Sequence, residues 1–177
     1  MNEVVEVLIT AEAVNERLDV LAGEIIRDYA NKTITLVCAL KGAVIFMTDL
    51  ARRLGTNVEI DFLRTSSYGD STDSSGNVRL DMDVTIDIHG RDVLLVEDIV
   101  DTGHTLVFLR KYLAAKNPAS LKVCVLLDKP DRRLNHEAVF DYLGFSIPDV
   151  FVVGFGLDYS QRYRNLPYIG VLRFIGE

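Results

Sequence analysis

One stretch of the chain, residues 93–105, limits most strongly what the sequence can fold into. It begins as an apolar run of strand length and then turns acidic at once, with Glu97 and Asp98. It closes on Asp101, Thr102 and Gly103, and apolar residues at helical spacing follow. Proteins of the α/β class place their ligand sites where a buried strand leads through a loop of small residues into a helix. We therefore expect an α/β domain with a site at the carboxyl end of this strand.

Apolar runs and helical patterns alternate along most of the chain. A short strand or extended arm is predicted at residues 4–9. The predicted elements that follow are a helix at 11–30, a strand at 33–40, a helix at 43–54, strands at 58–63 and 84–88, the strand of the opening stretch, a helix from 106 to near 117, and a strand at 121–127. This alternation predicts a central, mostly parallel sheet flanked by helices, with right-handed crossovers.

The C-terminal third lacks this alternation. Its strand-like runs, at residues 140–147, 151–155 and 169–175, have no clear helix between them. We expect a small β-rich hood over the carboxyl edge of the sheet, formed by the N-terminal arm and about residues 130–177. A chain of 177 residues is long enough for one domain with a proper core, so a single domain spanning 1–177 is predicted.

The overall charge argues against two classes of partner. The net charge is -7 and the pI is about 5.0, which disfavours nucleic acid and membrane surfaces because no basic patch can release many counterions. No apolar run approaches the ~18 residues of a membrane span, and the acidic N-terminus does not resemble a signal peptide. Cys38 and Cys124 lie inside apolar runs, which is typical of reduced, buried thiols in a cytoplasmic protein.

The standard phosphate-binding motifs are absent. The sequence has no Gly-x4-Gly-Lys-Ser/Thr and no Gly-x-Gly-x-x-Gly after a strand, which excludes a P-loop and a dinucleotide fingerprint. Asp-Thr-Gly at residues 101–103 also occurs in aspartic proteases, but a retroviral-type half-site sits in an all-β dimer, whereas this chain alternates strands and helices. What remains is a loop in which Thr102, Gly103 and Thr105 can offer N–H and hydroxyl donors to one phosphate at a helix N-terminus.

Acidic residues surround this predicted phosphate site. Glu97 and Asp98 suit sugar hydroxyls or Mg²⁺, which prefers one or two carboxylates together with substrate oxygens and waters. Asp101 lies inside the loop, where it could accept a proton. The arrangement therefore suits a ribose 5-phosphate that bears a metal-bound leaving group. Lys41 and Gly42, between a predicted strand and helix, form a second candidate anion site; a solvated lysine at a tight turn is the alternative.

A polar run at residues 66–77 has almost nothing to bury. Tyr68 is the one bulky group near its start. Loops of this length in a compact domain are usually lids or disordered excursions. A lid that orders over a ligand and a surface loop without function both remain open.

Residues 93–105 resemble the motif with which type I phosphoribosyltransferases bind phosphoribosyl diphosphate (PRPP): an apolar strand, two acids, two apolar residues and Asp/Glu-Thr/Ser-Gly-x-Thr. Further segments resemble the hypoxanthine-guanine branch of that family. Residues 40–42 look like its diphosphate loop, 66–69 like the start of its flexible lid, and 126–130 and 151–164 like its purine-binding segments. The matches follow one another in order over nearly the whole chain. The resemblance implies a type I phosphoribosyltransferase fold in a bacterial purine-salvage enzyme.

The resemblance also implies a reaction. The 5-phosphoribosyl group of PRPP would be transferred to N9 of hypoxanthine, and of guanine, giving IMP or GMP and diphosphate with Mg²⁺ as cofactor. Asp101 would be the catalytic base that takes the proton from N7 of the purine. Lys129 would donate to O6, Phe151 would stack on the base, and the backbone of Val152 would read its edge.

The other site residues that the resemblance implies face PRPP or a metal. They are Lys41, Gly42 and Arg164 for the diphosphate; Thr102, Gly103, His104 and Thr105 for the 5′-phosphate; Glu97 and Asp98 for the ribose hydroxyls or a metal; Asp158 for a second Mg²⁺; and Ser67 and Tyr68 in the lid. His104 stands where other members have Lys or Asn, so we expect its backbone N–H to make the contact and its side chain to face solvent. Ala43 replaces a glycine that is common in this branch.

Several points stay open at this level. Arg133 is either a substrate contact or a partly exposed charge. A xanthine-preferring phosphoribosyltransferase is one alternative function. The other is a regulator that senses nucleotides, although the chain has no helix-turn-helix extension and no basic face. The resemblance implies a homodimer or homotetramer, without deciding between them.

Overall fold

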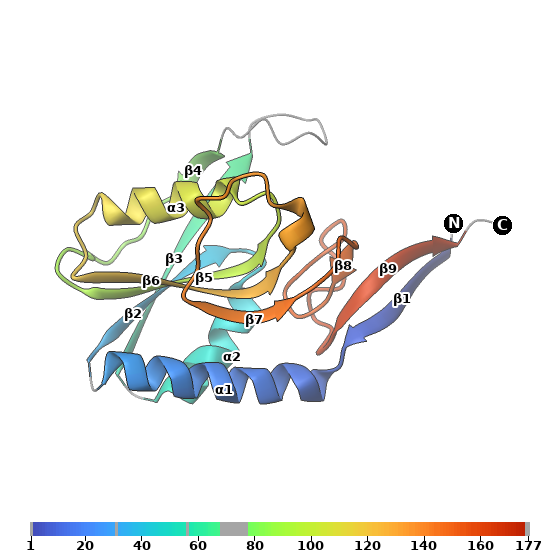
Figure 1. Ribbon diagram of the computed structural model, residues 1–177, viewed down its shortest axis with the longest axis horizontal. Coiled ribbons are helices and arrows are strands. Elements are labelled where there is room, and N and C mark those ends of the chain that lie inside the picture. Colours follow the sequence, from blue (N-terminus) through green and yellow to red (C-terminus); the bar gives the residue numbers. More distant parts are fainter. Residues whose placement is uncertain (1, 31, 56, 68–77, 176–177) are drawn as a thin grey trace.

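The computed structural model describes residues 2–30, 32–55, 57–67 and 78–175. Its main sheet has six strands in the order β4-β3-β2-β5-β6-β7 (Figure 1). Their bounds are β2 (Ile34–Leu40), β3 (Val58–Ser67), β4 (Val78–Met82), β5 (Asp92–Val100), β6 (Ser120–Asp128) and β7 (Tyr142–Ser146). All neighbouring pairs are parallel except β3 and β4. The predicted α/β class with a mostly parallel sheet is therefore confirmed.

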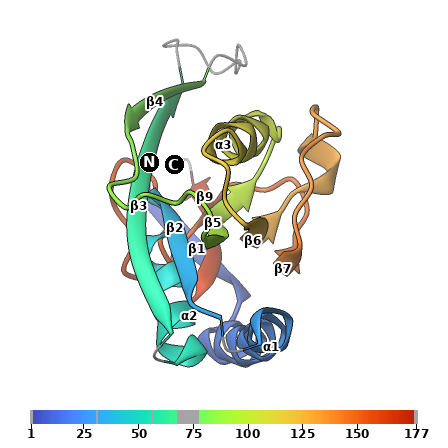
Figure 2. The same ribbon diagram turned by 90° about the vertical axis from the view of Figure 1, so that its left-hand side faces the viewer.

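Helices cover both faces of this sheet. α1 (Ala11–Tyr29) and α2 (Val44–Leu54) lie on one side, and α3 (His104–Ala114) lies on the other (Figure 2). Successive strand residues point to opposite faces, so Leu36 and Cys38 of β2 pack with α1 and α2, whereas Val37 packs with α3. Among the described residues, none of the helices has both the length and the apolar character needed to cross a membrane.

A second, three-stranded antiparallel sheet has the order β1-β9-β8. It consists of β1 (Asn2–Ile9), β8 (Val152–Val153) and β9 (Ile169–Ile175). Figure 1 shows β1 and β9 side by side, extending away from the main sheet. The N-terminal arm and the last strand thus pair with each other, and the segment between β8 and β9 reaches back toward the end of β2, where Gly156 lies against the backbone of Gly42.

The predicted hood is wrong in one respect. The strand-like run at 140–147 was expected in the β-rich subdomain, but β7 is an edge strand of the main sheet, parallel to β6. The crossover from β6 to β7 carries only a one-turn 3-10 helix, η1 (Pro130–Arg132), instead of an α-helix. Since no α-helix separates β6 from β7, the alternation of strands and helices does not indicate that β7 belongs to the main sheet. Arg17 of α1 fixes the strand by donating to the Leu143 carbonyl at 2.6 Å.

The predicted strand at 84–88 is also wrong. The backbone N–H groups of Thr85 and Ile86 donate to Asp61 Oδ2 at 2.6 and 2.7 Å. The Val84 N–H donates to its neighbour, Asp83 Oδ1. Because carboxylates take these donors, the segment cannot offer them to a neighbouring strand. The outer neighbour of β3 is β4 (Val78–Met82), and not the segment at 84–88.

Candidate active site

The site lies where the strand order of the main sheet reverses. From β2 the chain passes outward to β3 and β4, and it returns to β5 on the other side of β2. Ligands of open α/β sheets bind in the crevice beyond the carboxyl ends of the strands at such a switch point. Lys41 follows β2 and Asp101 follows β5, so the two predicted anion-binding loops flank this crevice.

The loop between β5 and α3 has the geometry of an anion site. Gly103 precedes the helix at φ 87° and has no side chain that could cap it. In the described structure no side chain makes a capping hydrogen bond to the first turn. The first N–H groups of α3, which begins at His104, are therefore open to an anion. The carbonyl of Thr102 accepts from the N–H groups of Leu134 and Asn135 at 3.1 and 2.9 Å, which braces the loop from behind.

Two acids lie near the end of β5 beside this loop, Glu97 buried and Asp98 partly buried. Glu97 is only 6% exposed, and its Oε1 atom is buried without a hydrogen-bond partner in the described structure. Burial raises the pKa of Glu97 well above its usual value, and the nearby Asp98 carboxylate adds to the rise. Burial also raises the pKa of Asp98 to about 6, although hydrogen bonds from its own backbone and from the Ile99 N–H oppose the shift. Both carboxylates therefore gain from a ligand that supplies positive charge or hydroxyl donors.

A divalent cation fits this pair. The residues that the structure describes include no cluster of three or more His, Cys, Asp or Glu that could hold a metal. Mg²⁺ does not need such a cluster, because it commonly uses one or two carboxylates with substrate phosphates and waters. The unpartnered oxygen of Glu97 can bind a cation or accept a hydrogen bond from a ribose hydroxyl.

Lys41 and Gly42 lie close to the acids. The Leu40–Lys41 peptide bond is cis. A Cβ atom on Gly42 would lie 1.5 Å from Asp98 Oδ2, so only glycine allows this loop to approach the end of β5. Lys41 Nζ donates to Gln161 Oε1 at 3.2 Å, which ties the loop to the segment after β8.

That segment carries Asp158 and Arg164. Arg164 Nη2 lies 2.6 Å from Asp158 Oδ1, and the Gln161 N–H donates to Asp158 Oδ2 at 2.8 Å. Asp158 is the predicted ligand of a second Mg²⁺, and both of its carboxylate oxygens are thus occupied by protein donors. Arg164 also donates through Nη1 to the Gly156 carbonyl at 2.6 Å. This pairing holds the predicted diphosphate-binding arginine at the rim of the crevice.

One hollow lies at the loop between β5 and α3, the predicted phosphate loop, and is lined by residues 97–103, 105 and 106. A second hollow adjoins it. Both hollows are lined by Asp98, Ile99 and Asp101, so they form one continuous site. The remaining residues of the second hollow come from the position after β6 and from the segments around β8: Lys129, Phe151, Val152, Leu157 and Asp158. Lys129 is 7% exposed, whereas Phe151 is 51% exposed and its ring could stack on a ligand. A flat, aromatic ligand with an acceptor toward Lys129 would fit here.

Asp101 stands between the two hollows. Its carboxylate is 41% exposed and accepts from Arg132 Nε at 3.0 Å. No pattern in the sequence indicates a role for this arginine, because Arg132 and Arg133 are adjacent and look alike. The structure separates them: Arg133 pairs with buried Asp128 and donates to the Ala138 carbonyl, so it supports the fold, and among the described residues it is not one of those that line the two hollows.

The predicted lid is only partly described. Ser67 ends β3 and pairs with Val78 of β4, so residues 66 and 67 belong to a strand and not to a loop. Tyr68 lies outside the described residues, and the roles of Ser67 and Tyr68 stay predictions.

Asp149, between β7 and β8, is a residue near the site that the sequence did not indicate. Its Oδ1 atom lies 3.6 Å from Lys129 Nζ.

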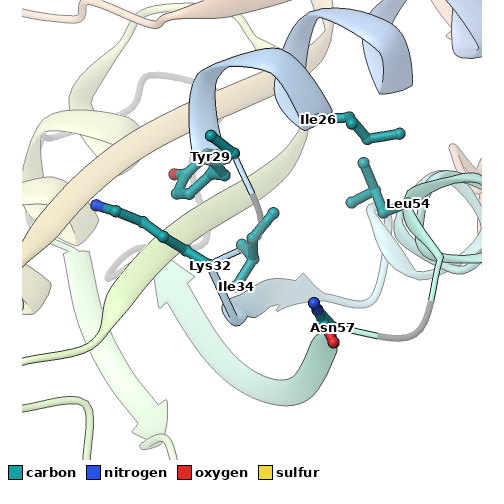
Figure 3. Close-up of a pocket in the computed structure, with 7 residues that line it drawn as sticks. Ile26, Tyr29, Lys32, Ile34, Leu54 and Asn57 are labelled. Atoms are coloured by element: carbon teal, nitrogen blue, oxygen red, sulfur yellow. The ribbon is translucent and has the colours of Figure 1, made fainter.

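A third hollow lies away from these groups (Figure 3). It opens near the amino ends of the strands, between the end of α1 and the end of α2, and Ile26, Tyr29 and Leu54 line it. Lys32 in its wall pairs with Asp92 at 3.0 Å. None of the predicted site residues lines this hollow, so it is not assigned to the candidate active site.

Comparison with known proteins places the chain in a family. The family model for the phosphoribosyl transferase domain matches residues 8–160. The hypoxanthine-guanine phosphoribosyltransferase of Mycobacterium tuberculosis (strain H37Rv) is 49% identical over 176 residues, which cover 96% of this chain and 87% of that protein. That of Streptococcus pneumoniae (strain R6) is 47% identical over 172 residues, covering 97% and 95%.

Solved structures agree with the sequence relatives. A hypoxanthine-guanine phosphoribosyltransferase from Bacillus anthracis superposes with a TM-score of 0.90 at 40% identity, covering 98% of this chain and 100% of that chain. A hypoxanthine phosphoribosyltransferase from Staphylococcus aureus gives 0.90 at 43% identity, covering 95% and 91%. The chain therefore belongs to the hypoxanthine-guanine phosphoribosyltransferase family, with a type I phosphoribosyltransferase fold.

Proposed function

We propose that this protein is a purine-salvage enzyme that transfers the 5-phosphoribosyl group of PRPP to N9 of hypoxanthine or guanine. The products are IMP or GMP and diphosphate. One observation carries the proposal: the open N-terminus of α3 and the acids Glu97 and Asp98 share a continuous site with Lys129 and Phe151, and Asp101 lies between them. A phosphate, a ribose and a flat base thus each have a complementary place.

The PRPP half of the site binds by charge and hydrogen bonds. The N–H groups and hydroxyls of residues 102–105 hold the 5′-phosphate, which the helix N-terminus favours. Glu97 and Asp98 accept from the ribose hydroxyls or bind Mg²⁺. Lys41 and Arg164 neutralise the diphosphate as the C1′–O bond breaks, which lowers the barrier to an oxocarbenium-like transition state.

Mg²⁺ belongs to this proposal as the cofactor. When bound with PRPP it neutralises charge on the leaving diphosphate. Glu97 and Asp98 are the residues that would hold it on the ribose side. Asp158 would take part in a second site only after exchanging its contacts with Arg164 and Gln161.

The purine half of the site selects a 6-oxopurine. Lys129 donates to O6, Phe151 stacks on the ring, and the backbone of Val152 contacts the base edge. Adenine carries a donor at position 6, which would face the donors of Lys129 and leave them unpaired. As N9 attacks C1′, Asp101 takes the proton from N7. We also propose that the protein acts in the cytoplasm, which its two buried free cysteines support.

A homodimer or homotetramer is part of the proposal. Several apolar side chains of the β1–β9 pair are exposed, with Val7 at 51%, Phe174 at 47% and Ile175 at 54%, and a second copy of the chain could cover them. Sedimentation equilibrium of the purified protein measures the assembly directly. A monomer at micromolar concentration would contradict this part of the proposal.

A purine panel tests the function. Purified protein is assayed spectrophotometrically with PRPP, MgCl₂ and one of hypoxanthine, guanine, xanthine or adenine. We expect turnover with the first two, none with adenine, and loss of activity when EDTA is added. Xanthine as the best substrate would instead support the alternative enzyme, and PRPP binding without turnover of any base would support a nucleotide-sensing regulator.

A further inference from the structure

The carboxylate of Asp149 lies between two cations that serve different parts of the site. Asp149 Oδ1 is 3.6 Å from Lys129 Nζ and 3.8 Å from Arg132 Nε. Arg132 Nε in turn donates to Asp101 Oδ1 at 3.0 Å. The side chains therefore form a row of alternating charge, Lys129–Asp149–Arg132–Asp101, which joins the purine-binding lysine to the catalytic base.

Lys129 needs a partner to fix its direction. Its side chain is 9% exposed and lines the hollow that Phe151 also lines. Within the part of the chain that the structure describes, Nζ makes no hydrogen bond, and Asp149 is the carboxylate with which it pairs. A lysine ammonium on a flexible four-carbon stem has no preferred direction of its own. A carboxylate on one side directs Nζ and leaves its other N–H groups free for an acceptor in the hollow.

Arg132 is shared between two acids. Its Nε atom lies 3.0 Å from Asp101 Oδ1 and 3.8 Å from Asp149 Oδ1, so Asp149 competes with Asp101 for the guanidinium. Without Asp149 the guanidinium would pair with Asp101 alone, and this closer ion pair would make the Asp101 carboxylate a weaker base. Arg132, Asp101 and Asp149 are each between 41% and 49% exposed, so these pairs add little to folding stability. Their effect should be on position.

We propose that Asp149 is a positioning residue for the transfer reaction. It orients Lys129 toward O6 of the purine and limits the contact between Arg132 and Asp101. The inference rests on the proposed function, because Lys129 and Asp101 have these roles only if the protein binds and deprotonates a 6-oxopurine.

The test uses Asp149→Asn, which keeps the size of the side chain and removes its charge. We expect the KM for hypoxanthine to rise about tenfold, the KM for PRPP to stay within about twofold, and kcat to fall. Asp149→Glu restores a carboxylate and should recover much of the hypoxanthine KM. Asp131→Asn is the matched control, since Asp131 is exposed and makes no ion pair with another described residue; it should behave as the wild type.

Lys129→Ala distinguishes a failure of the role of Asp149 from a failure of the proposed purine contact. If it raises the hypoxanthine KM while Asp149→Asn does not, Lys129 reads the purine and the role of Asp149 is refuted. If Lys129→Ala leaves that KM unchanged, the proposed purine contact itself fails, and the inference fails with it. Equal rises in both KM values for Asp149→Asn, with no recovery in Asp149→Glu, would show a structural role and overturn the proposal.

Discussion

Replacing Gly103 by alanine tests whether the loop before α3 is held in the shape that a phosphate needs. Gly103 has φ 87°, a left-handed conformation that L-residues rarely adopt. A Cβ atom there would lie 2.7 Å from Ala138 Cβ and 3.0 Å from the Asn135 carbonyl oxygen. The first distance is too short for two carbon atoms, and the second involves backbone, so the loop or the segment behind it must move.

Gly90 provides a matched control for the backbone cost. It also has a left-handed φ of 70°, but a Cβ atom added to it would meet no other atom within 4 Å, and it precedes β5 at the far end of the strand. A non-glycine residue in this conformation costs roughly 1–2 kcal/mol. Overpacking typically adds about 1–3 kcal/mol. Gly90→Ala should therefore lose about 1–2 kcal/mol of unfolding free energy, and Gly103→Ala about 2–5 kcal/mol.

Urea denaturation of both variants measures the difference in stability, and steady-state kinetics measures its effect on the site. The KM for PRPP should rise at least about tenfold in Gly103→Ala, because a displacement near 1 Å can cost that much or more. It should not change in Gly90→Ala. Equal losses of stability in the two variants, with an unchanged KM for PRPP, would refute the idea that residues 134–138 brace the phosphate loop.

Other variants test separate parts of the structure. Asp101→Asn should lower kcat with hypoxanthine about 10²–10⁴-fold while barely changing Tm, because its pair with Arg132 is half exposed; near-normal turnover would exclude it as the base. Asp98→Asn should stabilise the metal-free, ligand-free protein at pH 8, since burial raises the pKa of Asp98 to about 6 from an unfolded value near 3.9, so that ionisation costs stability as pH rises through this range. Thermal melts should show this gain shrinking as pH falls toward about 3, below both pKa values, where Asp98 is protonated in both states; a gain independent of pH would contradict the assignment. Arg133→Leu should lower the unfolding free energy by about 3 kcal/mol by leaving Asp128 buried and unpaired. Arg132→Leu should lower it by at most about 1 kcal/mol. Urea denaturation measures both losses, and a larger loss in Arg132→Leu would contradict this prediction.

Local periodicity explains which parts of the fold were predictable. α1 buries Val14, Leu18, Leu21, Ile25 and Tyr29, the residues that recur at helical spacing in the sequence. The buried strands β2, β5 and β6 were equally clear as apolar runs. The assignment failed where a distant side chain decided the structure. Asp61 accepts backbone donors of residues 85 and 86, and no local pattern in that apolar segment indicates that a carboxylate from β3 will reach it.

The same distinction governs the site. The phosphate loop and the Glu97–Asp98 pair are contiguous in sequence, so a motif could place them together. Asp149 lies twenty residues from Lys129 along the chain and becomes its neighbour only because β7 runs parallel to β6 at the sheet edge and returns the chain to the same end. A strand assigned to the hood could not predict that contact. The wrong position predicted for β7 and the failure to predict the contact of Asp149 therefore have one cause. The pairing of β7 with β6 places the Asp149 carboxylate beside the buried Lys129.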